Sequence, residues 1–404
     1  MPWPMVPFGK IADFRNGLNY TRDNHGDGLK VINVGDFGDR FLPDIDSLGE
    51  INPNGIADEA DYLQASDMLF VRSNGNRELI GRVMYMEDIP YPIAFSAFCI
   101  RARIAAPNAL PKFYAYYFRS GVVRNVLSST GGGASIANLN QGILNGFAVP
   151  IPDKKTQEAV VERLDAFESL LANSKQRVGL LEEAARLIYA EWFICQRFPG
   201  HKQGRVVARG LPSGWKASSI GVVTNYLNRG VAPSYDESSP KRVVNQKCIR
   251  DQQLSMEQAR NLANEISTEK WLQKGDVLIN STGTGTLGRI AQVREELDSV
   301  TVDTHVTIVR PKAGISPWFF GQQLLRMESI FESLGEGATN QTELKRDRIR
   351  DTSFLLPSPQ SMAAFDEKVE PMIEQIEVLR KQITQLRQAR DLLLPRLISG
   401  QLRL

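Results

Sequence analysis

Residues Pro150–Trp192 read PIPDKKTQEAVVERLDAFESLLANSKQRVGLLEEAARLIYAEW and carry the strongest structural signal of the chain. After the Pro-x-Pro, mostly apolar side chains recur at alternating steps of four and three residues, at Val160, Leu164, Phe167, Leu171, Ser174, Val178, Leu181, Ala185, Ile188 and Trp192. A 4-3 spacing sustained over four heptads predicts a coiled-coil helix. The prolines mark its start, because proline cannot continue a strand ladder. Roughly 36 residues at about 1.5 Å each make about 54 Å of helix.

A second stretch near the end of the chain has the same pattern. It also follows a Pro-x-Pro and places Phe365, Val369, Met372, Ile376, Leu379, Ile383, Leu386, Arg390, Leu393 and Leu397 at the same spacing. We expect the two helices to pack together along a seam of Leu164, Phe167, Leu171, Val178, Leu181, Ile188, Ile376, Leu379, Ile383, Leu386 and Leu393. The alternative is two amphipathic helices on separate cores, which need only a broad apolar stripe and explain strict heptads less well.

Each helix closes one copy of an internal repeat. Matching residues of the two copies lie 204 to 212 positions apart. The pairs are Trp3, Gly9 and Phe14 with Trp215, Gly221 and Tyr226; Asp67-Met-Leu-Phe with Asp276-Val-Leu-Ile; Gly81-Arg-Val with Gly288-Arg-Ile; Gly131–Ser135 with Gly335–Thr339; and Pro150-Ile-Pro with Pro357-Ser-Pro. The segments between these anchors differ strongly, which suits two copies of one scaffold that read different targets.

The repeat predicts a mixed α+β fold with two similar recognition domains, two long antiparallel helices and a pseudo-two-fold relation. The expected segments are residues 1–152 (first domain), 153–198 (central helix), 199–359 (second domain, with a linker at 199–214) and 360–404 (C-terminal helix). Alternating or β-rich runs predict strands at Ser66–Arg72, Gly81–Met86, Asp276–Asn280 and Ser299–Arg310. Apolar residues at helical spacing predict helices at Lys112–Leu127 and Pro317–Leu334.

Composition limits the classes of function. With 48 basic and 46 acidic residues the net charge is +2, so any nucleic-acid binding must come from local basic patches. The three cysteines and three histidines are scattered and form no zinc signature, and the odd cysteine count indicates a reducing compartment. A signal-peptide pattern and an apolar run of about 18 residues are both missing, which predicts a cytoplasmic chain without a membrane partner.

Two motifs suggest enzymes but lack the required context. Gly283-Thr-Gly-Thr-Leu-Gly288 fits GxGxxG, yet a dinucleotide-binding fold needs a helix to follow, and residues 289–294 repeat the strand-like residues 82–86. Glu343-Leu-Lys345 resembles the E-x-K of metal-dependent nucleases without a partner aspartate upstream, so a solvated charge cluster is favoured. We therefore predict no catalytic, cofactor-binding or metal-binding residues in the chain.

Polar, glycine-rich loops remain as candidate DNA-binding sites. Arginine, asparagine, serine and threonine read base edges and bind phosphates, and glycine lets the backbone approach a phosphate. Such clusters are usually simple turns, but these recur at matching points of both repeats, which favours DNA contact. The candidates are Arg72, Ser73, Asn74, Asn76, Arg77, Gly133, Ser135 and Asn138 in the first half, and Asn280, Ser281, Thr282, Thr284, Thr286, Thr339, Asn340, Gln341, Lys345 and Arg346 in the second.

The order and duplication of these features resemble the specificity subunits of type I restriction–modification systems. The resemblance rests on the repeats, the strand–loop pair Asp67–Asn74 and Asp276–Gly283, the Gly-x-Gly-Ala loops, the Pro-x-Pro before each long helix, and the ending Leu394-Pro-Arg-Leu-Ile-Ser-Gly-Gln. It covers nearly the whole chain.

The resemblance implies a division of labour. Each recognition domain reads one half of a bipartite site in double-stranded DNA, and the two helices set the unread gap and dock two methyltransferase subunits. Those subunits bind S-adenosylmethionine and methylate adenine, while restriction/translocase subunits use ATP and Mg for translocation and cleavage in host defence. This chain would be non-catalytic, with no cofactor of its own.

Two alternatives remain open. One is the specificity subunit of a related system that methylates and cuts DNA without a motor. The other, from a different class, is a coiled-coil scaffold that binds proteins rather than DNA. Sequence-specific binding of duplex DNA together with a methyltransferase partner distinguishes the scaffold from both specificity subunits.

Overall fold

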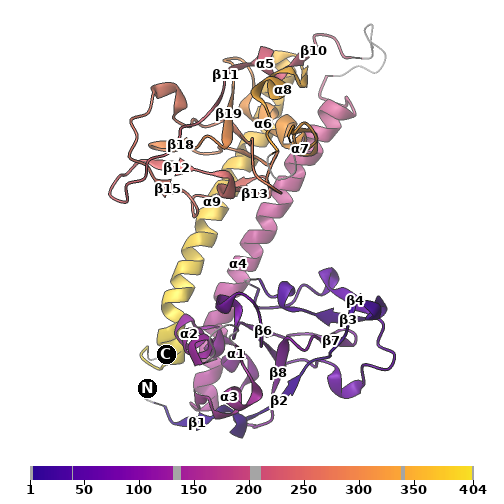
Figure 1. Ribbon diagram of the computed structural model, residues 1–404, viewed down its shortest axis with the longest axis vertical. Helices are drawn as coiled ribbons and strands as arrows, with labels where there is room; N and C mark the ends of the chain where they lie inside the picture. The colour runs from indigo at the N-terminus through magenta and orange to yellow at the C-terminus, as the bar shows by residue number, and fades with distance from the viewer. Residues whose placement is uncertain (1–2, 39, 131–137, 201–210, 338–341, 403–404) are drawn as a thin grey trace. The chain divides into compact units, whose positions relative to one another are not determined.

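The computed structural model describes residues 3–38, 40–130, 138–200, 211–337 and 342–402 (Figure 1). The chain divides into two compact units, Met1–Asn173 with Ile383–Leu404, and Ser174–Gln382. Each unit combines one α/β module with a segment of each of two long helices, α4 (Lys154–Tyr189) and α9 (Pro359–Ile398). We call the elements β1 to β9 the first module and β10 to β20 the second module. The four-segment domain division remains a prediction.

The first module is built on an antiparallel sheet in the order β2-β8-β5-β6. Its strands are β2 (Ala12–Asn16), β8 (Cys99–Ile104), β5 (Met68–Val71) and β6 (Val83–Tyr85). A second sheet joins β4 (Gly49–Ile51), β3 (His25–Ile32) and β7 (Ile93–Phe95), with β3 parallel to β7. The remaining elements are the paired strands β1 (Met5–Pro7) and β9 (Ala148–Pro150), and the helices α1 (Pro111–Arg119), α2 (Gly121–Thr130) and α3 (Gln141–Gly146).

The second module repeats this topology. Its four-stranded sheet has the order β11-β19-β16-β17, with β11 (Thr224–Arg229), β19 (Val306–Pro311), β16 (Val277–Asn280) and β17 (Ile290–Gln292). Its three-stranded sheet joins β15 (Arg260–Asn261), β12 (Arg242–Val244) and β18 (Val300–Val302), again with one parallel pair. The other elements are β10 (Lys216–Ser219), β20 (Ser353–Leu356), β13 (Ile249–Arg250), β14 (Gln253–Leu254), α5 (Ile220–Val223), α6 (Pro317–Leu325), α7 (Glu328–Ser333) and α8 (Arg346–Asp351).

The matching strand orders confirm the predicted mixed α+β fold with two similar modules. In each four-stranded sheet a short apolar strand lies at an internal position. These strands are β5 and β16, and all four residues of each are buried. A strand that is covered on both faces is apolar at every position, not at every second one. The sequences Met-Leu-Phe-Val of β5 and Val-Leu-Ile-Asn of β16 come close to this pattern. The internal strands therefore hold the loops that follow them at a defined edge of each module.

The aspartate before each internal strand ties it to the neighbouring strand. Asp67 accepts hydrogen bonds of 2.7 Å from Nε and from Nη2 of Arg103 on β8. Asp276 accepts the same pair of 2.7 Å bonds from Arg310 on β19. The two aspartates are 0 and 1% exposed, respectively, and such two-pronged contacts fix geometry as well as charge. Burial raises the pKa of Asp276, and the Arg310 guanidinium opposes that rise.

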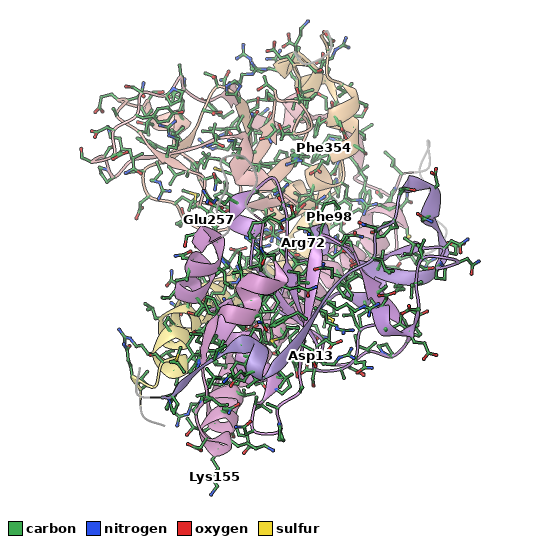
Figure 2. The ribbon with its side chains drawn as sticks, turned by 60° about the horizontal axis from the view of Figure 1, so that its bottom comes forward. Asp13, Arg72, Phe98, Lys155, Glu257 and Phe354 are labelled. Atoms are coloured by element: carbon green, nitrogen blue, oxygen red, sulfur yellow. The ribbon has the colours of Figure 1, made fainter. Side chains whose placement is uncertain are left out.

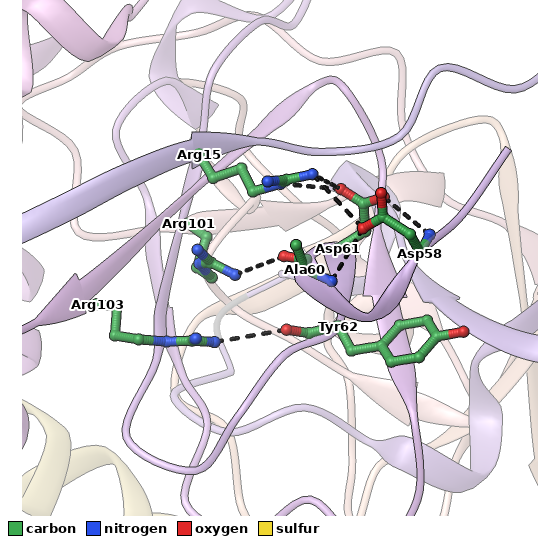
Figure 3. Close-up of polar contacts among 7 residues, drawn as sticks. All are labelled: Arg15, Asp58, Ala60, Asp61, Tyr62, Arg101 and Arg103. Atoms are coloured by element: carbon green, nitrogen blue, oxygen red, sulfur yellow. Dashed lines mark hydrogen bonds and ion pairs between the residues drawn. The ribbon is translucent and has the colours of Figure 1, made fainter.

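Arginines also hold the segment before each internal strand against the sheet. In the first module these contacts, drawn in Figure 3, join Arg15 to Asp61, Arg101 to the Ala60 carbonyl and Arg103 to the Tyr62 carbonyl at 2.6, 3.1 and 3.4 Å. In the second module Arg310 donates to the Trp271 carbonyl at 2.7 Å. These basic side chains are engaged in the fold, so the candidate DNA contacts lie elsewhere.

Three predicted elements are each divided in the structure. The predicted helix Lys112–Leu127 is two helices, α1 and α2, because Ser120 adopts extended dihedral angles (φ −57°, ψ 132°). The predicted helix Pro317–Leu334 is likewise α6 and α7, separated at Arg326–Met327. The predicted strand Ser299–Arg310 is β18 and β19, which belong to different sheets. They are separated by a turn in which the Asp303 carboxylate accepts a 2.8 Å bond from the His305 N–H, a local bond typical of aspartate in turns.

The long helices α4 and α9 are in contact and antiparallel. In the second unit Glu182 of α4 pairs with Arg380 of α9 at 2.6 Å, and farther along α4 the ring of Tyr189 meets Phe365, which is earlier in α9. In the first unit Glu168 pairs with Arg390 at 2.9 Å. No helix in the described part of the chain is long and apolar enough to span a membrane.

The predicted seam residues are buried or half-buried without exception. Leu164, Leu171, Val178, Ile376, Leu379 and Ile383 are buried, and Phe167, Leu181, Ile188, Leu386 and Leu393 are half-buried. The helix ends also enter module cores, since Leu164 of α4 and Leu394 and Leu397 of α9 belong to the core cluster of the first unit. The helices thus combine mutual packing with the core packing that the alternative interpretation emphasised.

Helix α9 also supplies a titratable group to the start of α6. The Asp366 carboxylate accepts a hydrogen bond from the Ser316 hydroxyl, and Ser316 caps α6. Burial raises the pKa of Asp366 to about 6, and the nearby Glu370 adds to the rise. Because the folded-state pKa is raised, protonation of this carboxyl stabilises the folded state.

We expect the wild-type chain to gain stability relative to Asp366→Asn as the pH falls from 7 towards 4. The asparagine variant does not titrate, so it should be the more stable chain near pH 7.5 and should lose that advantage below the Asp366 pKa. Thermal unfolding midpoints of both chains at half-unit pH steps measure the difference. Parallel midpoint curves for the two chains would show that this carboxyl does not titrate in the folded state as described.

Candidate nucleic-acid interface

In the first module the structure brings two predicted loops together. Strand β5 ends at Val71, and the loop after it begins with Arg72 and Ser73. Ser73 forms an isolated antiparallel bridge with Asn138, and the Leu139 N–H donates to the Arg72 carbonyl at 2.9 Å. Ser73 and Asn138, which are 65 positions apart in the sequence, therefore share one edge of the module.

The second module makes the same junction. Thr282 forms an antiparallel bridge with Glu343, and the Leu344 N–H donates to the Ser281 carbonyl at 2.8 Å. Leu139 and Leu344 are both fully buried, so each anchors its second loop in the core. The Asn138-Leu-Asn and Glu343-Leu-Lys segments thus occupy equivalent places, immediately before α3 and α8.

The candidates within the first loop of each module differ in exposure. Asn76 and Arg77 are exposed, and Arg72, Ser73 and Asn74 are half-buried. The amide oxygens of Asn74 and Asn76 accept backbone N–H groups two residues later, at 2.7 and 3.0 Å, so these side chains shape the loop. The Arg72 guanidinium donates to the Ala97 carbonyl at 3.2 Å.

In the second module, Thr284 is exposed and Thr282 and Thr286 are half-buried, whereas Asn280 and Ser281 are fully buried. The Asn280 amide donates to the Gln246 carbonyl at 3.1 Å, and the Ser281 hydroxyl lies 2.6 Å from that of Thr307. These two side chains support the loop from inside the module. Five candidates, Gly133, Ser135, Thr339, Asn340 and Gln341, lie outside the described residues.

The GxGxxG segment is a turn in the structure. Gly283, Gly285 and Gly288 have φ values of 107°, 70° and 79°, which glycine adopts without steric cost. The chain then enters strand β17 and not a helix. A Cβ on Gly288 would lie 2.5 Å from the Glu332 backbone nitrogen, so this glycine allows the loop to pack against α7. A pyrophosphate site of the dinucleotide-binding kind requires a helix at this point.

Charged side chains gather where α8 begins. Lys345 pairs with Glu336 at 2.7 Å and Arg350 with Asp347 at 2.5 Å. Hydrogen bonds from Lys345 and then Arg348 lower the pKa of Glu336, and the same contact raises the pKa of Lys345. Glu343, the glutamate of the nuclease-like motif, pairs with Arg229 at 2.7 Å. These pairings describe a solvated charge cluster, as predicted.

Arg346 differs from these neighbours. Its guanidinium hydrogen-bonds to the side-chain amide oxygen of Asn228, an uncharged group, so this contact leaves its positive charge in place. Arg346, Lys345 and Asn228 line a hollow of about 670 Å³ on the second module. An exposed guanidinium beside a polar hollow is suited to a phosphate or a base edge.

Sequence reasoning missed one pair of residues at these junctions. The Phe98 carbonyl accepts the Arg72 N–H at 2.8 Å, and Figure 2 shows the two residues near one another. The His305 carbonyl accepts the Ser281 N–H at 2.8 Å in the same way. Phe98 and His305 lie in the turns before β8 and β19, and the second turn was hidden inside the single predicted strand Ser299–Arg310.

Comparison with known proteins gives a consistent result. Residues 2–183 match the family described as the type I restriction modification DNA specificity domain. The chain is 25% identical over 321 residues to the MjaIX specificity subunit of a type I restriction enzyme from Methanocaldococcus jannaschii, covering 73% of this chain and 71% of that protein. It is 21% identical over 411 residues to the StySPI specificity subunit of a type I restriction enzyme from Salmonella potsdam, covering 94% of this chain and 84% of that protein.

A solved structure shares the fold. The type I restriction–modification S subunit from M. genitalium aligns with 98% of this chain and 96% of its own at a TM-score of 0.61 and 14% sequence identity. The similarity therefore extends over both modules and both long helices.

Proposed function

We propose, from the premise that this chain belongs to the family of type I restriction–modification specificity subunits, that each module reads one half of a bipartite site in double-stranded DNA. The chain is the DNA specificity subunit of such a system and is itself non-catalytic. Its cofactors belong to the modification and restriction subunits. In this proposal the reading surface of each module is the edge where its two polar loops meet.

The observation that carries the proposal is the repeated loop junction. Ser73 with Asn138 in one module, and Thr282 with Glu343 in the other, bring polar loops to equivalent edges of one scaffold. The scaffold is shared and the loop side chains differ, which is the arrangement expected if two modules read different sequences. The exposed or half-buried candidates are Arg72, Ser73, Asn74, Asn76, Arg77 and Asn138 in the first module and Thr282, Thr284, Thr286, Lys345 and Arg346 in the second.

Partners follow from the same premise. We propose that the paired helices dock two methyltransferase subunits, which supply S-adenosylmethionine chemistry on adenine, and that restriction subunits join through them in the cytoplasm. In the second unit, Leu180 and Leu187 are seven residues apart on α4, and so on one face of that helix, and both are more than half exposed. Exposed apolar side chains that gather on one surface commonly mark protein interfaces.

Selection from a random duplex DNA library tests the proposal. The purified chain with its methyltransferase subunit should enrich one sequence with two fixed parts and an unread gap, and neither protein alone should methylate it. A scaffold that binds only proteins predicts no enriched sequence. Enrichment of a single uninterrupted motif would contradict reading by two modules.

Within this complex, Arg346→Ala should weaken binding to all DNA sequences alike. A side chain that contacts phosphate contributes about 0.9 to the slope of log affinity against log salt concentration, and its loss weakens binding about three- to tenfold at moderate salt. Binding titrations at four salt concentrations measure the slope. Arg350→Ala is the matched control on the same helix, because Asp347 already neutralises that charge. A changed base preference with an unchanged slope would instead assign Arg346 to a base edge.

A further inference from the structure

Phe98 is a large apolar side chain in an exposed position. It is 60% exposed, while Ser96 before it and Cys99 after it are buried. The turn is held by backbone groups, since the Cys99 N–H donates to the Ser96 carbonyl at 2.9 Å and the Phe98 carbonyl accepts from Arg72 and Ser73 at 2.8 and 3.4 Å. The fold therefore uses the Phe98 main chain and leaves more than half of the residue exposed to solvent, and this exposed apolar area gains no burial energy.

The ring lies at the edge where the first module's loops meet. The Arg72 guanidinium donates to the Ala97 carbonyl at 3.2 Å, so the turn is joined to the loop after β5 by side chain as well as backbone. Both side chains are labelled in Figure 2. A contact made by the Arg72–Ser73 loop would therefore bring Phe98 close to the same ligand.

His305 occupies the equivalent position in the second module. The Val306 N–H donates to the Asp303 carbonyl at 3.3 Å, and the His305 carbonyl accepts from Ser281 at 2.8 Å, as in the turn of Phe98. His305 is also exposed, and its Nδ1 shares a 2.7 Å hydrogen bond with the Thr282 hydroxyl. One structural position thus carries an apolar ring in one module and a polar ring in the other.

We propose that these two turns are equivalent base-contacting positions, at which Phe98 makes an apolar contact with a base of the first half-site and His305 a polar contact with a base of the second. The inference rests on the proposed function, because it requires that the loop edge faces DNA. Apolar side chains contact thymine methyl groups or wedge between base steps, and neither contact depends on a phosphate charge. Phe98 therefore contributes to specificity without contributing to the salt dependence.

The test uses the complete complex of this chain with its methyltransferase subunit and the DNA site identified by library selection. Phe98→Ala should weaken binding to that site about tenfold, within the range typical for loss of one base contact. Phe98→Leu, which keeps an apolar side chain, should bind within about twofold of wild type, and the salt slope should not change in either variant. Tyr91→Ala is the matched control, since Tyr91 is also an exposed aromatic residue but precedes β7, whereas Phe98 follows it.

Selectivity assigns each turn to its half-site. The DNA site is varied by single-base substitutions. Compared with wild type, Phe98→Ala should tolerate substitutions better at one position of the first half, and His305→Ala at one position of the second half. If the Phe98→Ala complex binds and discriminates between sequences as the Tyr91→Ala control does, the inference is overturned. The proposed function still stands in that case if the wild-type complex methylates its site specifically. Absence of any site-specific binding by the wild-type complex overturns both. Because both side chains are exposed, the variants should melt within a degree or two of wild type, and melting curves check this.

Discussion

Removing one heptad from each long helix should leave the two half-sites unchanged and shorten the gap between them by about three base pairs. The deletions are Leu171–Arg177 in α4 and Ile383–Ala389 in α9, and seven residues keep each heptad pattern in phase. Seven residues at about 1.5 Å each shorten a helix by about 10 Å, which corresponds to about three base pairs at roughly 3.4 Å. The original site should fall towards non-specific binding, a loss of about a thousandfold.

The choice of segments follows from the cross-helix ion pairs. Both deleted segments lie between the Glu168–Arg390 and Glu182–Arg380 pairs along their helices, so both pairs are retained. Methylation mapping with the variant complex measures the new gap. Deletion from α4 alone is the control, because it keeps the heptad phase but leaves α4 about 10 Å shorter relative to α9, so the Glu168–Arg390 and Glu182–Arg380 pairs can no longer form together and assembly should fail. An assembled double-deletion complex that methylates sites with the original gap would refute helices as the determinant of spacing.

Asp276→Ala should destabilise the second unit by about 3–5 kcal/mol, the usual cost of removing one partner of a buried ion pair. Arg310 would keep its charge in a site where its side chain is 10% exposed, with no carboxylate to accept its two 2.7 Å bonds. The loss in the free energy of unfolding should be largest for the second unit. Chemical denaturation of the whole chain measures it. Asp67→Ala should behave in the same way in the first unit, because Arg103 is left in the equivalent position.

A surface pair in the same unit provides the control. Asp347 and Arg350 lie 2.5 Å apart with side chains 74 and 52% exposed, and Asp347→Ala should cost at most about 1 kcal/mol. The double variant Asp276→Leu with Arg310→Met should recover stability relative to Asp276→Ala, since it removes the unpaired charge. Equal losses for Asp276→Ala and Asp347→Ala would contradict the assigned role of the buried pair.

The features that the sequence could predict are those that repeat or follow a short period. The heptads predicted α4 and α9, and the two copies of Asp-x-Leu predicted a shared scaffold around β5 and β16. Apolar periodicity predicts such elements because it depends on residues only a few positions apart in the sequence.

The features that the sequence could not predict depend on contacts between distant residues. The partner of Asp67 is 36 positions away at Arg103, and the contact between Ser73 and Asn138 spans 65 positions. The turn that presents His305 lies inside an unbroken β-rich run, where two short strands of different sheets resemble one long strand. Asn280 and Ser281 were predicted to contact DNA, and only the structure shows that both side chains are buried at the end of β16.

Reading of a bipartite DNA site by the two modules is tested by a genome-wide methylation map of a host without its own system, which carries this chain together with a methyltransferase subunit. We expect methylated adenine in one new motif with two fixed halves and a gap of constant length, and no new motif when either protein is omitted. A new motif that appears with the methyltransferase subunit alone, or one that lacks a gap, would show that the two modules do not read a bipartite site.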